Sequence, residues 1–595
     1  MAGLSHWKFG RFELYRVNPP LVRMVAALPV IAVGYEEDWS GFYEGPGARP
    51  VFSMGEDFVA ANGERTFLLT MIARWACMPF SWLGAIVCYL WGRDLYGQQA
   101  GLVACFVWCF EPNILANASL YTADAHSAAL GLAACYTFWK WLRQPTWTQA
   151  VITGVVLGVA ELAKTTLILF YPLWPLIWLA YRWAEWAQMT TKRWLSEAAM
   201  LALRIAIGLY VVNLGYGFEG SFKPLGEFHF VSNLFTGKAA EHQQSDTPNP
   251  QSINRFQGTS LEHLPVPFPK NYLLGMDIQQ NDFENYGRPF YLRGEWSQAG
   301  WWYYYLYAGA VKVPLGLLLL GAVGCFCPIA LRTFGCKETS SPVARAQDTL
   351  TLLTPAVVVL CVVSLKTGIN EHFRYVLPAF PFLFVWVGGG FQSFCKLAEK
   401  KADYQAPFAA RSMAHLFSNI RLLCSLLLMW LAASSLWVYP HSLSYFNESI
   451  GGPIHGTKHL LGSNMDWGQD LRYVKSYIDQ ARLNVGPPFR FFFHNNSGGA
   501  KPAHLGLEQT ALASDSRLVE SVEGDVGAAY RFAVSTDVLF GVPKMDSSTQ
   551  LVWYPLASLT QGERGEQVER IAYTAKVFTK NSGARPKRSL NEAAK

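Results

Sequence analysis

The sequence predicts an α-helical polytopic membrane protein with a small soluble α/β domain at its C-terminal end. The first observation is the composition, because 51% of the 595 residues are hydrophobic and only 15% are charged, with a mean hydropathy of +0.14. Soluble domains carry roughly 25% charged residues. The second observation is a series of long apolar segments between residues 75 and 438, and the third is the polar, strand-like composition after residue 439.

The first 74 residues are predicted to lie outside the membrane on its external surface. Residues 20–34 are apolar but too short to span and contain Arg23, which indicates an amphipathic helix along the surface. Residues 36–64 are acidic and rich in glycine and proline, which indicates a loop ending at the turn Asn62-Gly63. No signal-peptide pattern is present, so we expect a further membrane helix to precede this chain.

Ten apolar segments follow as candidate membrane spans, although several are shorter than the ~20 residues that a perpendicular helix needs. They are residues 75–93, 98–112, 124–142, 148–164, 165–181, 196–214, 303–330, 348–365, 375–392 and 419–438.

The loops between these segments predict the orientation of the chain. Lysine and arginine gather in one alternate set of short loops, which includes Arg93, Arg143, Lys192 and Arg332, and such loops remain in the cytoplasm. The opposite face then receives the N-terminal region, the turn 111–123, the loop 215–300, the turn 366–374 and everything after Tyr439.

The region from 439 to 580 is predicted to be the external α/β domain. Residues 468–483 have helical periodicity, whereas residues 488–494, 530–535 and 570–578 have strand composition. The polar, basic tail 581–595 is predicted to be disordered.

Composition also excludes some kinds of partner and site. The net charge of +6 is small for this length and forms no basic stripe, so nucleic acid is not an expected partner. All eleven cysteines lie in or beside apolar segments, so the C-terminal region holds neither a disulfide framework nor a thiolate zinc site.

Polar groups at the external edges of the apolar segments form the candidate site: Asn18, Asp124 with His126, Lys164, and Arg374 with Tyr375. A carboxylate at membrane depth is costly, which favours a functional role for Asp124. Arg374 is able to hold phosphate oxygens through parallel hydrogen bonds. Such an edge suits a lipid-linked substrate, whose head group stays at the interface while its tail lies in hydrocarbon.

Each of these groups also has a structural interpretation. Thr122 or Asp124 is suited to capping the following helix, and Lys164 to extending toward the interface from the end of its span. Arg374 is suited to interfacial anchoring, and His126 to packing. Asp466 and Asp470 are candidates on the acceptor side or for a metal, or they belong to a helix start. No tight ligand spacing appears, so no metal site is assigned and a divalent metal stays open.

Several blocks in order along the chain carry a resemblance to a known group of enzymes. They are Asn18-Pro19-Pro20-Leu21, WGRDLYG (91–97), TADAH (122–126), GVAELAKTT (158–166), LPVPFPKNYLLGMD (264–277), FRYVLPAFP (373–381), YFNESIGGP (445–453) and LLGSNMDWGQDL (460–471). The chain resembles the dolichyl-phosphate-mannose-protein mannosyltransferase and aminoarabinose-transferase group, membrane glycosyltransferases of family 39 with the GT-C fold.

The resemblance implies inverting transfer of a sugar from a polyprenyl phosphate to a protein, lipid or polysaccharide acceptor on the non-cytoplasmic face. Asp124 matches the second acidic position of the family, Arg374-Tyr375 its turn near the lipid phosphate, and Asn18 a position often filled by a cation. The Asp-Glu motif of the first external loop would fall before Ala2. We expect a multi-pass protein of a bacterial inner (plasma) membrane, with the external parts periplasmic or extracellular. The alternatives are a catalytically inactive scaffold and a transporter or flippase.

Overall fold

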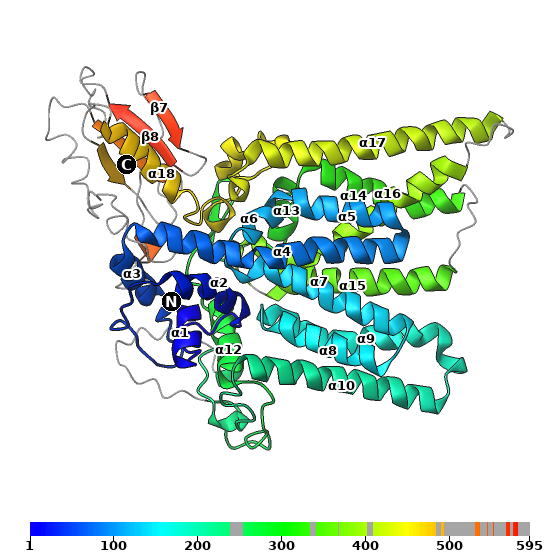
Figure 1. Ribbon diagram of the computed structural model, residues 1–595, viewed down its shortest axis with the longest axis horizontal. Coiled ribbons are helices and arrows are strands. Elements are labelled where there is room, and N and C mark those ends of the chain that lie inside the picture. The colour runs from blue at the N-terminus through cyan, green and yellow to red at the C-terminus, as the bar shows by residue number, and fades with distance from the viewer. Residues whose placement is uncertain are drawn as a thin grey trace.

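The computed structural model describes residues 1–237, 254–333, 341–366, 368–400 and 408–483, together with six short strand segments beyond them. The apolar part of the chain forms long helices that run side by side (Figure 1). They are α4 (Arg65–Tyr96), α5 (Gln98–Phe110), α7 (Ala123–Arg143), α8 (Trp147–Glu161), α9 (Phe170–Arg182), α10 (Thr191–Gly215), α13 (Tyr304–Lys312), α14 (Leu315–Thr333), α15 (Pro342–Lys366), α16 (Phe380–Lys400) and α17 (Phe408–Val438).

The predicted helical polytopic fold is confirmed, with differences in the spans. Among the described residues, five helices are long and apolar enough to cross a membrane, or up to seven if each bent pair counts as one span. Each of the ten predicted segments falls on helical structure, but α8 and α9 have only 15 and 13 residues.

Several predicted spans are not continuous α-helices. The segment 303–330 is bent by 112° between α13 and α14, where Pro314 removes a backbone donor. The segment 165–181 begins with the 3-10 turn η1 (Thr165–Leu169) before α9. A third break of 62° separates α5 from α6 (Pro112–Ala118), within the turn predicted at 111–123.

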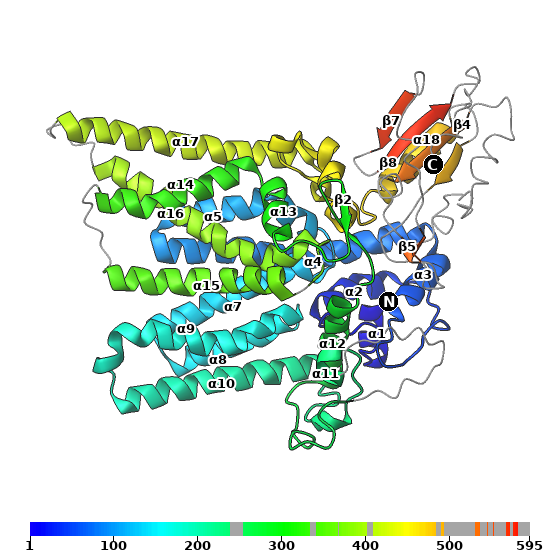
Figure 2. The same cartoon turned by 180° about the vertical axis from the view of Figure 1, so that it is seen from behind.

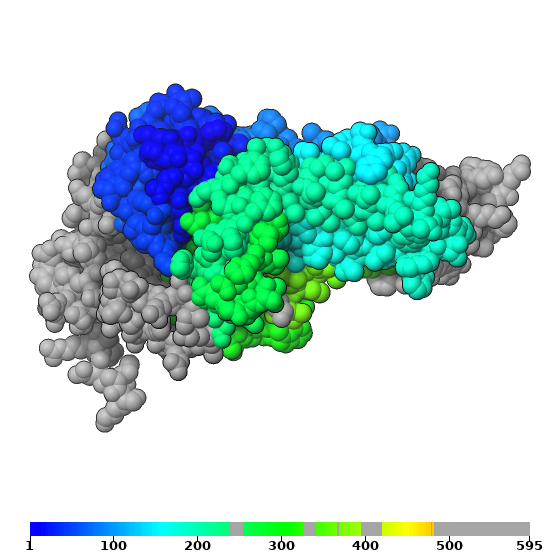
Figure 3. Space-filling view, turned by 90° about the horizontal axis from the view of Figure 1, so that it is seen from below, coloured from blue at the N-terminus to red at the C-terminus, as the bar shows by residue number. Residues whose placement is uncertain are grey.

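The N-terminal region and the segment after α10 lie together at one end of the bundle. They contain α1 (Ala2–Phe9), α2 (Leu21–Val33), α3 (Val51–Asn62), α11 (Asn233–Thr236), α12 (Lys270–Glu284), and the paired strands β1 (Phe290–Leu292) and β2 (Glu295–Ser297). Figure 2 shows the same grouping from behind, and Figure 3 shows the N-terminal surface beside that of the segment before α12.

The predicted loop at 36–64 is wrong in its second half, because α3 occupies residues 51–62 and α4 starts at Arg65. The Asn62 side chain joins the end of α3 to the segment before it. Its amide donates to the carbonyls of Glu36 and Phe58, and its Oδ1 accepts from the Glu36 N–H. The predicted surface helix at 20–34 is present as α2.

The segment after α17 packs on the bundle before the C-terminal strands begin. It is a succession of short 3-10 turns: η5 (Ser442–Ser444), η6 (Glu448–Ile450), η7 (Pro453–Lys458) and η8 (Gly462–Asn464). The buried Lys312 ammonium donates to the carbonyls of Leu443 and Asn464, both at 2.7 Å. The Asn447 amide donates to the carbonyls of Ala310 and Val313.

The C-terminal region contains α18 (Leu471–Leu483) and a four-stranded sheet in the order β3-β4-β8-β7. The strands are β3 (Phe489–Phe492), β4 (Tyr530–Ser535), β7 (Gln567–Ile571) and β8 (Ala575–Lys580), and a separate pair is β5 (Lys544–Met545) with β6 (Leu551–Val552). The single strand predicted at 570–578 is wrong, because β7 and β8 are antiparallel partners there. The tail 581–595 lies outside the described residues.

Glycines allow α8 and α10 to approach closely, and α8 leads directly to Lys164. A Cβ atom on Gly158 would lie 2.5 Å from Val211 Cβ and 2.7 Å from the Gly208 carbonyl oxygen. Because the second of these atoms is backbone, a side chain at Gly158 requires the helices to move apart.

We therefore expect Gly158→Ala to lower the free energy of unfolding by about 1–3 kcal/mol through overpacking. Gly321→Ala is the matched control, since a Cβ there meets nothing within 4 Å. Both changes add the same helix propensity. Thermal unfolding of the purified protein in detergent measures the difference, and equal melting temperatures for the two variants would contradict the packing argument.

Candidate active site

Three charged side chains from separate elements meet at the end of the bundle where α1–α3 and α12 lie. The Lys164 ammonium donates to Asp124 Oδ1 at 2.7 Å, and Arg374 Nε lies 3.3 Å from Asp124 Oδ2. The side chains of Asp124 and Lys164 are 7% and 5% exposed, and that of Arg374 is 15% exposed. We call these three residues the Asp124 cluster.

Local backbone structure turns each member of the cluster inward. Asp124 lies in the first turn of α7, where the Thr122 side chain makes no capping hydrogen bond. Lys164 has an extended backbone between α8 and η1, so its ammonium points to Asp124 instead of extending to the surface. Arg374 belongs to the 3-10 turn η4 (Phe373–Ala379). The capping role of Thr122 and the surface-directed Lys164 are therefore both excluded by the geometry.

Aromatic rings enclose the cations of the cluster. The Arg374 guanidinium carbon lies 3.7 Å from the ring centroid of Trp467, and the Lys164 ammonium lies 5.3 Å from that of Tyr375. Cations above aromatic faces are attracted to the ring quadrupole, more strongly where water is excluded. Arg374 Nη1 is buried and has no hydrogen-bond partner among the described residues.

The turn that carries Arg374 is held by the segment 461–464. Asn464 Oδ1 accepts from the Phe373 N–H at 3.0 Å, while its amide donates to the carbonyls of Glu371 and Leu461 and to the Tyr304 hydroxyl. His372 Nδ1 is hydrogen-bonded to Ser463 Oγ at 2.6 Å. Burial, with the nearby charges of Arg374, Arg288 and Lys164, holds the pKa of His372 well below its usual range. The imidazole is therefore neutral at pH 7.

Helix α12 contacts the chain next to Lys164. Thr165 Oγ1, next to Lys164, donates to Gln279 Oε1 at 3.0 Å. Asp282 lies within electrostatic range of Tyr375 and is paired with Arg49. Burial raises the pKa of Asp282, and the Arg49 charge opposes that shift.

The structure also places His126 and Asn18, the other residues that the sequence predicted for the donor side of the site. His126 Nδ1 donates to the Thr122 carbonyl at 2.6 Å and its ring packs edge-on against Phe80, as the packing interpretation expects. The Asn18 amide donates to the Tyr15 hydroxyl at 2.8 Å, and Tyr15 lies within electrostatic range of Tyr375.

Asp466 and Asp470 make local structural contacts. Asp466 Oδ1 accepts from the Gly468 N–H at 2.8 Å, and His441 Nδ1 lies 2.8 Å from Asp470 Oδ1. The predicted helix begins later than residue 468, at Leu471. In the part of the chain that the structure describes, no group of three His, Cys, Asp or Glu residues is placed to hold a metal ion.

Asn464, Trp467, Glu371 and Asp282 were not identified from the sequence. Trp467 follows the predicted Asp466 directly, and Glu371 precedes Arg374 by three residues. For Trp467 and Glu371, closeness in sequence to a predicted residue was the signal that could have found them. The contacts that make them important join segments that are far apart in sequence.

Because Asp124 neutralises two buried cations, we expect Asp124→Asn to lower the free energy of unfolding by about 3–5 kcal/mol. The double variant Asp124→Asn/Lys164→Gln removes one stranded charge, so its loss should be smaller than the sum of the two single losses. Denaturation of the purified variants, arranged as a double-mutant cycle, measures this coupling.

The control for that cycle is Asp479→Asn, which breaks a partly exposed pair with Lys475. Exposed pairs contribute up to about 1 kcal/mol, so little loss is expected. Additive losses at Asp124 and Lys164 would show that the two charges do not depend on each other.

Part of the chain, including Asp124 and Lys164 but not Arg374, matches a known protein family. Residues 69–211 match the model of the dolichyl-phosphate-mannose-protein mannosyltransferase family. A search of curated proteins finds no match to this chain.

The solved structures to which this chain is similar include ArnT from Cupriavidus metallidurans in the apo state, with 14% identity, a TM-score of 0.40, and coverage of 98% of this chain and 93% of that chain. The same protein bound to undecaprenyl phosphate gives 14% identity, a TM-score of 0.39 and the same coverage. The oligosaccharyltransferase of Archaeoglobus fulgidus gives 12% identity, a TM-score of 0.41, and coverage of 90% of this chain and 65% of that chain. The family segment contains both Asp124 and Lys164, and the resemblance to dolichyl-phosphate-mannose-protein mannosyltransferases is confirmed over residues 69–211.

Proposed function

We propose that this chain is a membrane glycosyltransferase that transfers a sugar from a polyprenyl-phosphate donor to an acceptor on the non-cytoplasmic face of the membrane. The observation that carries the proposal is the Asp124 cluster, in which two cations from separate elements converge on one buried carboxylate. The match of residues 69–211 to a mannosyltransferase family supports the class of reaction.

The charges of the cluster suit the phosphate of such a donor. Lys164 and Arg374 carry two positive charges and Asp124 one negative charge, which leaves one positive charge in excess. A glycosyl phosphodiester carries one negative charge, so its binding neutralises the cluster. Arg374 Nη1 is buried without a described partner, and a hydrogen bond to a phosphate oxygen would satisfy it.

The same cations stabilise the charge that develops during transfer. In the proposed reaction, the bond between the sugar C1 and the phosphate oxygen breaks, and a bond forms between C1 and the acceptor oxygen on the opposite face, with inversion. The leaving polyprenyl phosphate gains negative charge, which fixed cations in a site of low dielectric constant stabilise. Lys164 and Arg374 are the groups that hold it.

Asp124 has two roles in this proposal. It positions Lys164 and Arg374 before the donor binds, because its two oxygens each contact one of them. When phosphate draws Arg374 toward itself, one Asp124 oxygen is released and is able to take the proton of the acceptor hydroxyl. Tyr375 lies beside the Lys164 ammonium and completes the donor side of the site.

The location of the cluster supports a lipid-linked substrate over a transported solute. Asp124 lies at the start of α7, Lys164 just after α8 and Arg374 just before α16, all at helix ends. Coupling sites of transporters lie near the middle of the membrane on broken helices. We propose a protein of the bacterial inner membrane with this site on the periplasmic or extracellular side and a protein, lipid or polysaccharide acceptor.

Binding of a polyprenyl phosphate to the purified protein tests the donor site. Arg374→Lys keeps the charge but loses the planar fork, and we expect binding to weaken about 10-fold; Arg374→Gln should weaken it about 10- to 100-fold. Native mass spectrometry or quenching of tryptophan fluorescence gives the dissociation constants, and sugar release from a labelled donor gives the activity.

Lys458→Gln is the control, because Lys458 is an exposed cation in η7, outside the Asp124 cluster. It should bind and react like the wild type. Wild-type affinity in both Arg374 variants, with folding intact by thermal unfolding, would disprove the donor site.

A further inference from the structure

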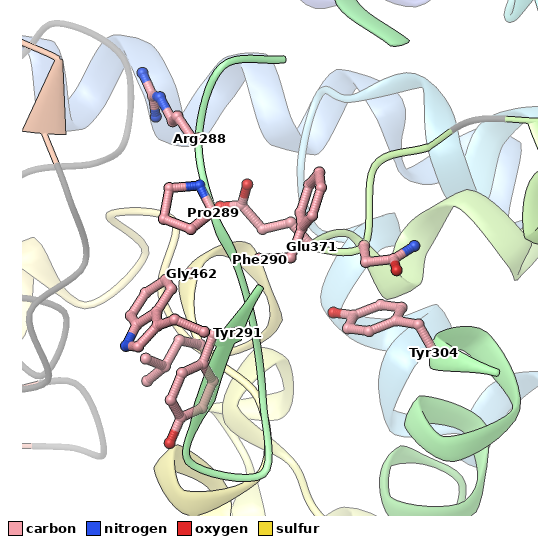
Figure 4. A pocket seen from close by; sticks show the side chains of 10 residues that line it. Arg288, Pro289, Phe290, Tyr291, Tyr304, Glu371 and Gly462 are labelled. Carbon is pink, nitrogen blue, oxygen red and sulfur yellow. The ribbon is translucent and has the colours of Figure 1, made fainter. Parts of the chain in front are cut away.

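Two cavities of very different size lie at opposite ends of the protein. The cavity between the β1–β2 hairpin and residues 461–462, which Glu371 helps to line, leaves about 20 Å³ for water (Figure 4). That space holds about one water molecule. The other cavity leaves about 310 Å³ and lies between the turn after α7 and the start of α10, at the end of the bundle away from α1–α3 and α12 (Figure 1). The second of these is large enough for part of an organic ligand.

The larger cavity has a polar lining, and we call it the Lys192 pocket. Its lining includes Pro145, Thr190, Lys192, Arg193, Ser196 and Glu197. Thr190 is the N-cap of α10, because its Oγ1 accepts from the Arg193 N–H at 3.3 Å. The N-terminal end of a helix carries partial positive charge, which favours an anion beside it.

Ion pairs balance part of the charge around this pocket but leave Lys192 without one. Glu197 accepts from Arg182 Nε at 2.8 Å and from Arg193 Nε at 3.0 Å. Arg193 also pairs with Glu185, so the two carboxylates balance the two arginines. Lys192 is exposed, and the ion pairs among the described residues do not include it. Its positive charge is therefore in excess.

A buried arginine adds a second positive charge below the pocket. Arg204 lies on the same face of α10 as Met200, which also lines the pocket, and its Nε donates to the Met200 carbonyl at 3.3 Å. The guanidinium is thus directed back toward the pocket end of α10, with its carbon 3.5 Å from the ring centroid of Trp141. Arg204 is 0% exposed, and neither Nη1 nor Nη2 has a hydrogen-bond partner among the described residues. Unsatisfied donors at this depth are costly, and an anion in the pocket would relieve that cost.

Tryptophans beside the pocket indicate that it lies at the level of a membrane interface. Trp183 and Trp186 are 77% and 53% exposed. Trp186 packs against Trp194 at 5.0 Å between ring centroids, and Trp194 follows Arg193 of the pocket lining directly. Tryptophan is enriched where the hydrocarbon of a membrane meets its head groups. A ligand that enters here therefore meets a lipid surface.

An exposed apolar stripe leads away from the pocket along α8. Helix α8 begins two residues after Pro145, and its side chains of Trp147, Val151 and Val155 are all exposed. Their spacing of four residues places them on one face of the helix. A molecule whose phosphate occupies the pocket is thus able to lay a hydrocarbon chain along this face.

We propose that the Lys192 pocket binds the phosphate of an anionic phospholipid, with Lys192 on the exposed side, Arg204 at the inner end and an acyl chain along α8. The two excess positive charges suit a head group of one or two negative charges. Basic pockets between membrane helices on the cytoplasmic side bind such head groups, and Lys192 belongs to the loops that the sequence predicts to be cytoplasmic. The site lies at the other end of the bundle from the Asp124 cluster and does not depend on the proposed function.

The experiment titrates the full-length protein in detergent with phosphatidylglycerol and with phosphatidylcholine, and native mass spectrometry gives the dissociation constants. The wild type should bind phosphatidylglycerol more tightly. We expect Lys192→Gln to weaken that binding about 3- to 10-fold and Arg204→Met about 10-fold or more, because each removes one charged donor. Lys192 is exposed, so its substitution leaves the fold intact.

Thermal unfolding without anionic lipid separates lipid binding from a structural role of Arg204. Arg204→Met removes a buried charge whose two terminal nitrogens have no described partner, so this variant should unfold at a higher temperature than the wild type. A more stable protein that binds the anionic lipid less well is the result expected of a ligand-binding arginine. A lower unfolding temperature would show that Arg204 is needed for packing and would overturn its assignment to the site.

Two control variants locate the lipid. Lys140→Gln removes an exposed cation near the same end of α7 that does not line the pocket, and Arg374→Gln alters the Asp124 cluster. Both should bind phosphatidylglycerol like the wild type. Binding that is lost in Arg374→Gln but kept in Lys192→Gln and Arg204→Met would place the lipid at the donor site and overturn the inference.

Two further outcomes would also overturn the inference. Equal affinity of the wild type for phosphatidylglycerol and phosphatidylcholine would show that the pocket does not select an anionic head group. Competition by glycerol 3-phosphate at the concentrations where phosphatidylglycerol binds would show that the acyl chains contribute nothing and that the ligand is a soluble phosphate. The proposed function stands or falls separately, on polyprenyl-phosphate binding at Arg374.

Discussion

The end of the helical bundle at which α1–α3 and α12 lie depends for its organisation on the burial of the Asp124 carboxylate between Lys164 and Arg374. None of the three charges is tolerable alone at this depth, because an unpaired buried charge costs several kcal/mol. The start of α7, the exit from α8 and the η4 turn must therefore meet at one place. The close approach of α8 to α10 at Gly158 then fixes where Lys164 emerges.

Contacts from the segment after α17 hold the turn that carries Arg374, and with it the Asp124 cluster, in place. Asn464, Ser463 and Trp467 come from the segment after α17, yet they hold the turn at residues 371–374 through side chains. Lys312 fixes the same segment to the α13–α14 break, because its ammonium donates to two carbonyls there. The segment from 439 to 470 thus belongs structurally to the site, although its composition resembles that of a soluble domain.

Hydropathy predicted the long helices well, because contact with lipid requires an apolar composition that can be recognised within each segment of the sequence. The elements outside the long helices were less predictable, since α3 and α12 are stabilised by contacts such as Asn62 with Glu36 that composition does not reveal. Asp124, Lys164 and Arg374 were predictable because charge at an apolar edge is unusual. Glu371, Asn464 and Trp467 were not predictable, because polar and aromatic residues are common in loops and their importance comes from partners about 90 residues away or more.

The pairing of Asp124 with both cations also bears on turnover in the proposed reaction. A site of two unpaired cations would bind the leaving phosphate, with its added negative charge, more tightly than the donor, and would release it slowly. Asp124 competes with phosphate for Lys164 and Arg374, so departure of the product restores two ion pairs instead of stranding two buried charges. The two cations then stabilise the charge that develops in the transition state without holding the product tightly.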